Sequence, residues 1–407
     1  MSLLYTFLIY IYGITIKIVA VFNDKARMWV NGRKEQSIPD LKNKKVIWMH
    51  CSSLGEFEQG RPVFEKLKHQ MPDYIFVLSF FSPSGFNSMK NYKYADYILY
   101  LPLDLPTKAK KFIDKINPEI SIFVKYDFWY NYLKYLNDEK RKVIFISVLL
   151  EENHRLFKSI NKIILNQLRK VDKIFTQDDS TVSILKNHDL NNVEKAGDTR
   201  IDRVVEITHQ SFSDKIIERF ISNKKEVFIC GSTWEKDIDI LSANKELLVK
   251  KYNLIIAPHE ISEKQINHII QKFSGYKINK YSENNTGKYN ILIIDKIGIL
   301  SRIYRYADIA YIGGGFGKSI HNTLEPGAYM IPVIFGPNYK RFTEANYLVS
   351  NNSFFSINDA NQFEEIIISL SNKDFYKEVQ NRIGGYFEKN KNASSQIVRY
   401  IKTQTNS

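Results

Sequence analysis

Cysteine is scarce in this chain, which holds only Cys51 and Cys230 among its 407 residues. The two lie far apart in the sequence and in no metal-ligand spacing, so a disulfide framework is excluded and a reducing compartment is favoured. No cluster of histidine, cysteine and carboxylate residues suggests a bound metal. The residue spacing therefore predicts no metal site.

One short pattern, Asp237-Ile238-Asp239, matches the D-x-D arrangement of metal-dependent sugar transferases. It falls inside a predicted helix, in which residues two apart do not share a face. We interpret the two aspartates as part of a solvated helix face.

Acidic residues are outnumbered: the chain carries 44 Asp and Glu against 58 Lys and Arg, a formal net charge of +14. An excess of this size suggests an anionic partner, such as nucleic acid, anionic lipid or a phosphorylated substrate. General lysine richness along the chain is a rival explanation. A compact basic helix and an aromatic-basic RNA motif are both missing from the sequence, which argues against nucleic acid.

The N-terminus is the exception to a soluble profile, because residues 3–22 are apolar apart from Lys17 and a few hydroxyls. About twenty residues can just span a bilayer; a half-inserted anchor and a buried core helix are the alternatives. No positive charge precedes the run and no small-residue cleavage site ends it, which disfavours a signal peptide. By the positive-inside rule, the basic residues that follow place the folded body on the cytoplasmic side. They are Lys25, Arg27, Arg33, Lys34, Lys42, Lys44 and Lys45.

Short apolar runs alternate with segments of helical spacing through the rest of the chain. This alternation predicts an α/β fold with parallel sheets covered on both faces. The predicted strands are 44–50, 74–80, 97–101, 120–124, 143–149 and 173–176 in the first half, and 226–230, 253–257, 289–294, 309–312 and 333–335 in the second. The same strand–turn–helix order appears in both halves without a repeat of the sequence. We expect two Rossmann-like domains that face one another across a cleft, the architecture called GT-B among glycosyltransferases.

Four segments follow from this pattern. They are a membrane anchor helix (1–22), an N-terminal Rossmann-like domain (23–205), a C-terminal Rossmann-like domain (206–389) and a polar, helix-capable tail (390–407) that packs back on the first domain.

Two carboxylates stand at strand exits of the first half, where ligands bind in open parallel sheets. Glu56 follows Ser52-Ser53-Leu54-Gly55 at a predicted helix start, and Asp127 follows a later strand. A helix dipole keeps Glu56 ionised, as a general base must be, but lowers its basicity. The alternative for Glu56 is a favourable contact with that dipole alone.

The second half offers a nucleotide pocket at the exit of strand 309–312. Gly313–Gly315 permit close backbone approach to a ligand, and the following helix start offers free N–H groups. Asn322 and Thr323 are also good N-caps, so capping alone is the alternative for these two.

Taken in order, these exits resemble the 3-deoxy-D-manno-octulosonic acid (Kdo) transferase family of lipopolysaccharide synthesis. The matching stretches are His50-Cys51-Ser52-Ser53-Leu54-Gly55-Glu56-Phe57, Tyr100-Leu101-Pro102-Leu103-Asp104, Gly197-Asp198-Thr199-Arg200-Ile201-Asp202-Arg203-Val204, Gly231-Ser232-Thr233-Trp234, Ile256-Ala257-Pro258-His259, Gly313-Gly314-Gly315 and His321-Asn322-Thr323-Leu324-Glu325-Pro326. The resemblance implies a GT-B enzyme on the cytoplasmic face of the inner membrane. It implies transfer of Kdo from CMP-Kdo to a lipid A precursor, lipid IVA, with inversion and with no metal or other cofactor. A UDP-sugar transferase, or a non-catalytic protein that binds anionic lipid or nucleic acid, is the alternative.

The resemblance also implies roles for particular residues. Glu56 is the expected general base, and Asp127 supports the acceptor site. The expected acceptor-binding residues are Ser53, Gly55, Ser82 and Ser84. The expected donor-binding residues are Gly231, Ser232, Thr233, Pro258, His259, Gly313, Gly314, Gly315, Asn322, Thr323 and Glu325. His259 stands where many members carry arginine, and Lys318, Lys340 or Arg200 is expected to compensate for that charge.

Overall fold

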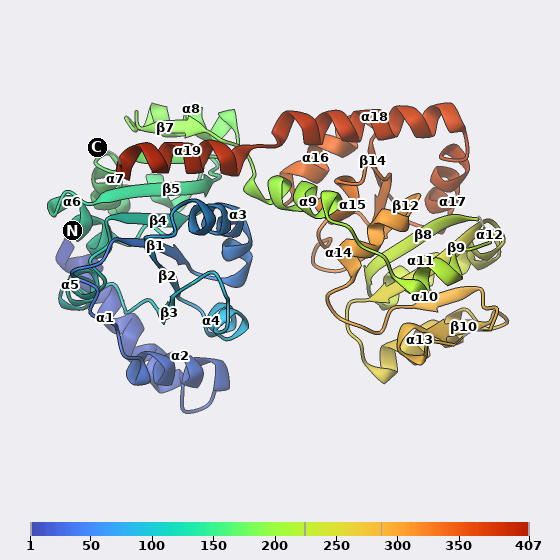
Figure 1. Ribbon diagram of the computed structural model, residues 1–407, viewed down its shortest axis with the longest axis horizontal. Coiled ribbons are helices and arrows are strands. Elements are labelled where there is room, and N and C mark those ends of the chain that lie inside the picture. The colour runs from blue at the N-terminus through green and yellow to red at the C-terminus, as the bar shows by residue number, and fades with distance from the viewer. Residues whose placement is uncertain (1, 224, 286, 406–407) are drawn as a thin grey trace. The chain divides into compact units, whose positions relative to one another are not determined.

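The computed structural model describes residues 2–223, 225–285 and 287–405 (Figure 1). They form two compact units: an N-terminal unit of residues 1–202 with 391–407, and a C-terminal unit of residues 203–390. Each unit is built on one parallel seven-stranded sheet with helices packed on it. The predicted α/β class with two Rossmann-like halves is therefore confirmed.

The sheet of the N-terminal unit has the strand order β3-β2-β1-β4-β5-β6-β7. Its strands are β1 Val46–Cys51, β2 Ile75–Phe80, β3 Tyr97–Tyr100, β4 Ile120–Val124, β5 Lys142–Val148, β6 Lys173–Thr176 and β7 Val193–Lys195. The direction of strand order reverses between β1 and β4, which pair in parallel. Such a switch point opens a crevice at the carboxyl ends of the two strands, where ligands bind.

Helices cover both faces of this sheet, and aromatic packing fixes them there. Trp48 of β1 is fully buried; its ring contacts those of Phe112 and Phe123, and its indole N–H donates to Ser79 Oγ at 2.8 Å. Burial of a ring this large, with its polar atom satisfied, stabilises the fold by several kcal/mol. The helices are α1 Ser2–Val19, α2 Asp24–Glu35, α3 Leu54–Gln70, α4 Pro83–Met89, α5 Pro106–Ile116, α6 Tyr130–Asp138, α7 Lys162–Leu168, α8 Asp179–Asn187 and α9 Thr199–His209, which runs on into the next unit.

The last helix that the structure describes, α19 (Ala393–Thr405), packs against α3 of the N-terminal unit. Ile397 and Ile401 join the buried cluster on that face of the sheet. The backbone N–H groups of Asn392 and Ser394 donate to the carboxylate of Asp202 at the start of this return. Apolar burial and a hydrogen-bonded carboxylate thus hold the C-terminal helix in the N-terminal unit.

The sheet of the C-terminal unit has the order β10-β11-β9-β8-β12-β13-β14. Its strands are β8 Glu226–Thr233, β9 Tyr252–Pro258, β10 Ile278–Lys280, β11 Ile291–Ile293, β12 Ile309–Ile312, β13 Val333–Phe335 and β14 Phe354–Ser356. Its helices are α10 Lys215–Phe220, α11 Glu235–Ala243, α12 Lys245–Lys251, α13 Glu263–Lys272, α14 Leu300–Ile303, α15 Leu324–Gly327, α16 Thr343–Ser350, α17 Ala360–Ser369 and α18 Lys373–Asn390. β8 and β12 are adjacent and parallel at the switch in strand order.

Helix α1 is long and apolar enough to cross a membrane, and only 6% of it is buried within the protein. Its buried side nevertheless touches the rest of the N-terminal unit, for example at Tyr5 and Gly13. The Tyr5 hydroxyl donates to Asp104 Oδ2 at 2.6 Å, and an added Cβ at Gly13 would lie 2.6 Å from Leu103. Residues 5 and 13 are two turns apart, about 12 Å along the axis. The helix therefore lies along the unit over this length, with most of its apolar side chains exposed.

Candidate active site

Glu56 lies in the first turn of α3, directly after the exit of β1. Ser53 caps this helix, because its hydroxyl accepts from the Glu56 N–H while the Glu56 carboxylate accepts from the Ser53 N–H at 3.2 Å. The N–H of Ser52 also donates to Glu56 Oε2, at 2.5 Å. This reciprocal cap fixes the carboxylate at the end of the strand.

Asp127 comes from the exit of β4, the strand that pairs with β1 at the switch point. The Ser52 N–H donates to Asp127 Oδ2 at 2.9 Å, and the Ser52 hydroxyl donates to Asp127 Oδ1. Asp127 is 6% exposed. The structure thus brings together two carboxyl groups that are 71 positions apart in the sequence, with one backbone amide shared between them.

The two carboxyl groups differ in how firmly they hold a proton. Burial raises the pKa of Asp127 well above its usual range, and the charge of Glu56 raises it further. Burial also raises the pKa of Glu56, but the N–H groups of Ser52 and Ser53, the charge of Lys125 and a hydrogen bond with Asp127 oppose that shift. These opposing contributions favour the proton on Asp127 and the charge on Glu56. The N–H groups at the helix start do lower the pKa of Glu56, as expected, but burial outweighs them and the net pKa is raised.

His50, on β1, lies beneath this pair and is fully buried. Its Nε2 is 3.5 Å from Asp127 Oδ2, and its Nδ1 lies 2.9 Å from Ser79 Oγ. Burial lowers the pKa of His50 to about 3, so the ring is neutral at physiological pH. A neutral imidazole adds no charge that would ionise Asp127. The sequence places His50 within a recognisable motif, but only the sheet shows which group it faces.

A cavity of about 520 Å³ opens above Glu56 and Asp127. Two residues of α1, Tyr5 and Ile9, form part of its wall, so the apolar helix borders the candidate site. The other lining residues are Ser52, Phe81, Tyr126, Phe128, Trp129, His154, Arg155, Leu156, Asn161 and Ile164.

The residues expected to bind the acceptor lie around this cavity rather than in its wall. Ser53 caps α3, and Gly55 is exposed in the first turn of that helix. Ser82 caps α4 by accepting from the Gly85 N–H at 3.1 Å, and its hydroxyl lies 3.2 Å from that of Ser84. Ser82 lines a neighbouring cavity of about 420 Å³ that also contacts α1. Their role in acceptor binding stays a prediction.

We expect Asp127→Asn to keep most of the turnover and Asp127→Ala to lose it. Asparagine has the shape and neutrality of a protonated aspartic acid and retains a donor toward Glu56. Alanine leaves the Ser52 amide and hydroxyl without this partner, at a cost of about 1–3 kcal/mol and a misplaced Glu56. We expect about a hundredfold loss in kcat for Asp127→Ala and less than about tenfold for Asp127→Asn. Equal losses in a steady-state assay would show that Asp127 acts as an anion.

In the C-terminal unit, the exits of β8 and β12 pack closely against each other. An added Cβ at Gly313 would lie 2.2 Å from the Ser232 carbonyl oxygen, and one at Gly231 would lie 1.9 Å from the Tyr304 hydroxyl. Gly314 has a φ of +91°, in the left-handed region that favours glycine. Close packing therefore requires glycine here. The Gly313 N–H donates to the Gly231 carbonyl, so that amide is already engaged.

Asp237 of α11 organises this junction. It is 1% exposed and accepts from the Trp234 N–H at 2.8 Å, the Gly314 N–H at 2.9 Å and the Tyr311 hydroxyl at 2.8 Å. The prediction of a solvated face is wrong for Asp237 and holds for Asp239, which is exposed and pairs with Lys272 at 2.5 Å. The sequence signal for this role of Asp237 is its position three residues after the N-cap residue Trp234, where an acidic side chain can accept from the cap N–H. No group of three metal-ligating side chains occurs among the described residues.

Trp234, His259 and His321 form a ring stack beside the glycine loop. The ring centroid of His259 lies 4.5 Å from that of Trp234 and 4.3 Å from that of His321. The Trp234 indole N–H donates to His321 Nε2 at 3.0 Å. Burial lowers the pKa of His321 to about 4, and the neighbouring His259 lowers it too, so His321 is a neutral acceptor at physiological pH.

A cavity of about 850 Å³ lies next to this stack, large enough for a nucleotide. Of the predicted donor-binding residues, only Gly314 is part of the wall of this cavity. His259 is not in the wall, but its ring stacks on Trp234 and His321, which are. Lys318 also lines the cavity and supplies a positive charge there. Arg200 pairs instead with Asp198 at 2.6 Å.

Asn322, Thr323 and Glu325 stand together at the start of α15. The Asn322 side chain accepts from the Leu324 N–H and donates to Glu325 Oε1, each at 3.1 Å. Burial raises the pKa of Glu325, against the hydrogen bond from Asn322 and the charge of Arg203. The Thr323 hydroxyl is buried without a hydrogen-bond partner among the residues that the structure describes. This turn thus offers an anchored carboxylate and one unused hydroxyl.

Comparison with known proteins shows what the N-terminal unit is similar to. Residues 27–203, which carry Glu56, Asp127 and their sheet, match the family model described as 3-deoxy-D-manno-octulosonic-acid transferase (kdotransferase). This stretch resembles the Kdo transferase family over 177 of the 407 residues, so the resemblance noted from the sequence is confirmed. The comparison supports a glycosyltransferase enzyme.

Relatives among Kdo transferases align over most of the chain. A 3-deoxy-D-manno-octulosonic acid transferase of Chlamydia trachomatis is 24% identical over 381 residues, 88% of this chain and 86% of the relative. One from Aquifex aeolicus is 26% identical over 306 residues, 73% and 78% of the two chains. A bifunctional glycosyltransferase/methyltransferase of Fusobacterium nucleatum is 27% identical over 394 residues; this chain spans 60% of its length.

The fold also resembles that of solved sugar-nucleotide enzymes. A UDP-GlcNAc 2-epimerase from Neisseria meningitidis superposes with a TM-score of 0.61 at 14% identity, over 88% of this chain and all of that one. At this identity the likeness shows the fold alone.

Proposed function

We propose that this protein transfers Kdo from CMP-Kdo to the lipid A precursor lipid IVA, with inversion at the anomeric carbon. The observation that carries the proposal is the Glu56–Asp127 pair, which leaves one ionised, partly buried carboxylate at the wall of a cavity in the unit that matches the family model. Glu56 takes the proton of the acceptor hydroxyl as that oxygen attacks the anomeric carbon, and CMP leaves. Proton transfer in the transition state contributes about 10²–10⁴-fold to such a rate.

The C-terminal unit binds the CMP part of the donor in this proposal. The cavity beside Trp234 and His321 offers stacking surface, and Lys318 supplies charge for the single phosphate. Glu325, tied to Asn322, holds the ribose hydroxyls. A positively charged side chain of this kind can stabilise a phosphate leaving group without a metal ion.

The test is mass spectrometry of lipid IVA after incubation with the purified chain and CMP-Kdo. We expect a product that carries added Kdo, whose mass also reports the number of additions. UDP-sugars offered in parallel test the alternative donor class. Absence of product from CMP-Kdo, with product from a UDP-sugar, would reject the proposal.

Turnover is expected to survive EDTA, because the proposed phosphate contacts use protein groups. The measurement is the initial rate of Kdo transfer before and after chelation and dialysis, with MgCl₂ added back as the control. Loss of turnover that Mg²⁺ restores would place a cation at the leaving group and contradict this part of the proposal.

We propose that α1 holds the enzyme on the cytoplasmic face of the inner membrane as an interfacial helix. Its contacts at Tyr5 and Gly13 keep it along the N-terminal unit, while its remaining apolar side chains, Phe7 among them, are free to enter the bilayer. With the helix lying in the membrane interface, Tyr5 and Ile9 border the cavity at Glu56. An acceptor whose acyl chains stay in the membrane would then react in this cavity.

A further inference from the structure

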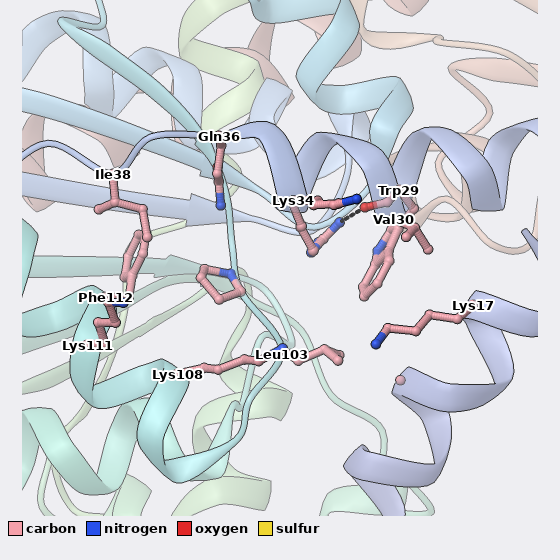
Figure 2. Close-up of a pocket in the computed structure, with 13 residues that line it drawn as sticks. Lys17, Trp29, Val30, Lys34, Gln36, Ile38, Leu103, Lys108, Lys111 and Phe112 are labelled. Atoms are coloured by element: carbon pink, nitrogen blue, oxygen red, sulfur yellow. Dashed lines mark hydrogen bonds between the residues drawn. The ribbon is translucent and has the colours of Figure 1, made fainter.

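A separate cavity of about 380 Å³ in the N-terminal unit is bordered by α1, α2, α5 and the segment after β3. Each charged side chain in its wall is basic: Lys17 of α1, Arg33 and Lys34 of α2, and Lys108 and Lys111 of α5. In Figure 2, Lys17 and Lys108 extend from their two helices toward the same space. The cavity thus collects positive charge from the consecutive helices α1 and α2 and from α5, which follows about 70 residues later.

These charges have no acidic partner among the residues that the structure describes. The four lysines take part in no ion pair and no hydrogen bond there. The Arg33 guanidinium donates to three carbonyl oxygens, including Phe81 O at 2.7 Å and Leu101 O at 2.9 Å, and lies 3.7 Å from the centre of the Trp29 ring. It is a fixed positive charge held by backbone rather than by a carboxylate.

In the described part of the chain, another lysine of α5, Lys110, has an acidic partner, unlike the lysines that line the cavity. Lys110, on another side of the same helix, pairs with Asp114 at 2.8 Å. Lys108 instead faces like charges: burial lowers its pKa, and the charges of Lys17 and Arg33 lower it further. Like charges that converge without a counter-ion cost free energy, which a bound anion offsets.

The position of the cavity indicates where that anion comes from. Gly13 and Lys17 of α1 form one wall, next to the exposed apolar face of that helix. Trp29 forms another part of the wall, and tryptophan with lysine is the combination that proteins place at the headgroup level of a bilayer. These neighbours favour the phosphate of a lipid headgroup as the anion.

We propose that this cavity binds the phosphate of an anionic bilayer phospholipid and seats the N-terminal unit on the membrane surface. The inference rests on the proposed attachment through α1. The cavity shares no lining residue with the one at Glu56, and on α1 the two are bordered by different turns, Gly13 and Lys17 against Tyr5 and Ile9. The lipid of this proposal is a component of the bilayer and is distinct from the acceptor.

Co-sedimentation of the full chain with vesicles tests the site. Vesicles of phosphatidylcholine alone are compared with an equimolar mixture of phosphatidylcholine and phosphatidylglycerol. We expect the double variant Lys34→Gln/Lys108→Gln to bind the mixed vesicles about 25-fold more weakly than wild type, since each basic residue near an anionic surface contributes about fivefold. Binding to phosphatidylcholine alone should be unchanged in this variant.

The matched control is Lys170→Gln/Lys186→Gln, which has the same net charge. Both residues are exposed and lie beside β6 and α8, at the opposite edge of the same sheet from α2. We expect this pair of changes to alter vesicle binding by less than about twofold, because screening removes distant charges from the interaction. Equal losses in the two double variants would show diffuse attraction and overturn the site.

Two further results would also overturn it. In the first, the Lys34→Gln/Lys108→Gln variant has a raised KM for lipid IVA in neutral detergent micelles but binds vesicles as the wild type does. The cavity would then bind the acceptor and not a bilayer lipid. In the second, the wild-type protein binds both vesicle types equally. Kdo transfer in detergent is measured separately, so failure of the lipid site is distinguishable from failure of the proposed reaction, and sedimentation with phosphatidylcholine alone reports on α1.

Discussion

Glutamine in place of Glu56 is expected to lower kcat by about 10²–10⁴-fold, because an amide cannot accept the proton of the acceptor hydroxyl. The fold should survive, since glutamine at this helix position can still complete the cap with Ser53. Affinity for CMP-Kdo should be unchanged, because the proposed donor cavity lies in the C-terminal unit. Single-turnover assays and donor titration measure the two quantities.

The control is Glu58→Gln, which removes the same charge from the same helix. Glu58 pairs with Arg61 at 3.0 Å and does not line the cavity at Asp127. We expect near-normal turnover in this variant. Comparable turnover in the Glu56 and Glu58 variants would remove Glu56 from the mechanism.

The pH dependence of turnover follows from the same carboxylate. Glu56 acts only when ionised, and burial raises its pKa above the ordinary value for glutamate, about 4.3. Activity is therefore expected to fall as the pH is lowered through this raised pKa, and the acid limb of the kcat/KM profile should lie above the ordinary glutamate range. A profile that stays flat down to pH 4 would contradict the assignment.

The architecture was predictable because its strands are buried and apolar. The runs 120–124 and 309–312 coincide with β4 and β12; β4 is the central strand of its sheet, and β12 pairs with the central strand β8 of the other. The edge strands β7, β10 and β14 were missed, since each has only three residues and no periodic signal. Strand order is set by tertiary packing, so the contact of β1 with β4 was visible only in the structure.

The candidate site was predictable in its residues but not in its electrostatics. Glu56 and Asp127 stood out as carboxylates at strand exits, and the adjacency of β1 and β4 brings them to one amide, that of Ser52. Which of the two holds a proton depends on burial and on neighbouring donors, and the sequence specifies neither. Asp237 was misjudged for a related reason: helical spacing separates faces but does not say which face is buried.

Asp237→Ala is expected to destabilise the C-terminal unit by about 3 kcal/mol and to weaken donor binding. The change leaves the N–H groups of Trp234 and Gly314 and the hydroxyl of Tyr311 buried without their acceptor. Unsatisfied buried donors cost about 1–3 kcal/mol each, partly relieved by relaxation. Because two of these donors fix the glycine loop and the Trp234–His321 wall, the cavity should lose its shape as well.

Asp239→Ala provides the control within the same three-residue pattern. Asp239 is exposed and pairs with Lys272 at the surface, so its loss should change stability by less than about 0.5 kcal/mol and leave donor affinity intact. Differential scanning calorimetry and CMP titration measure both variants. If Asp237 were instead a metal ligand of the D-x-D type, both substitutions would impair turnover alike and the wild type would require a divalent cation. If Asp237 is purely structural, only Asp237→Ala should melt at a lower temperature than the wild type. Turnover of the wild type should then be insensitive to EDTA.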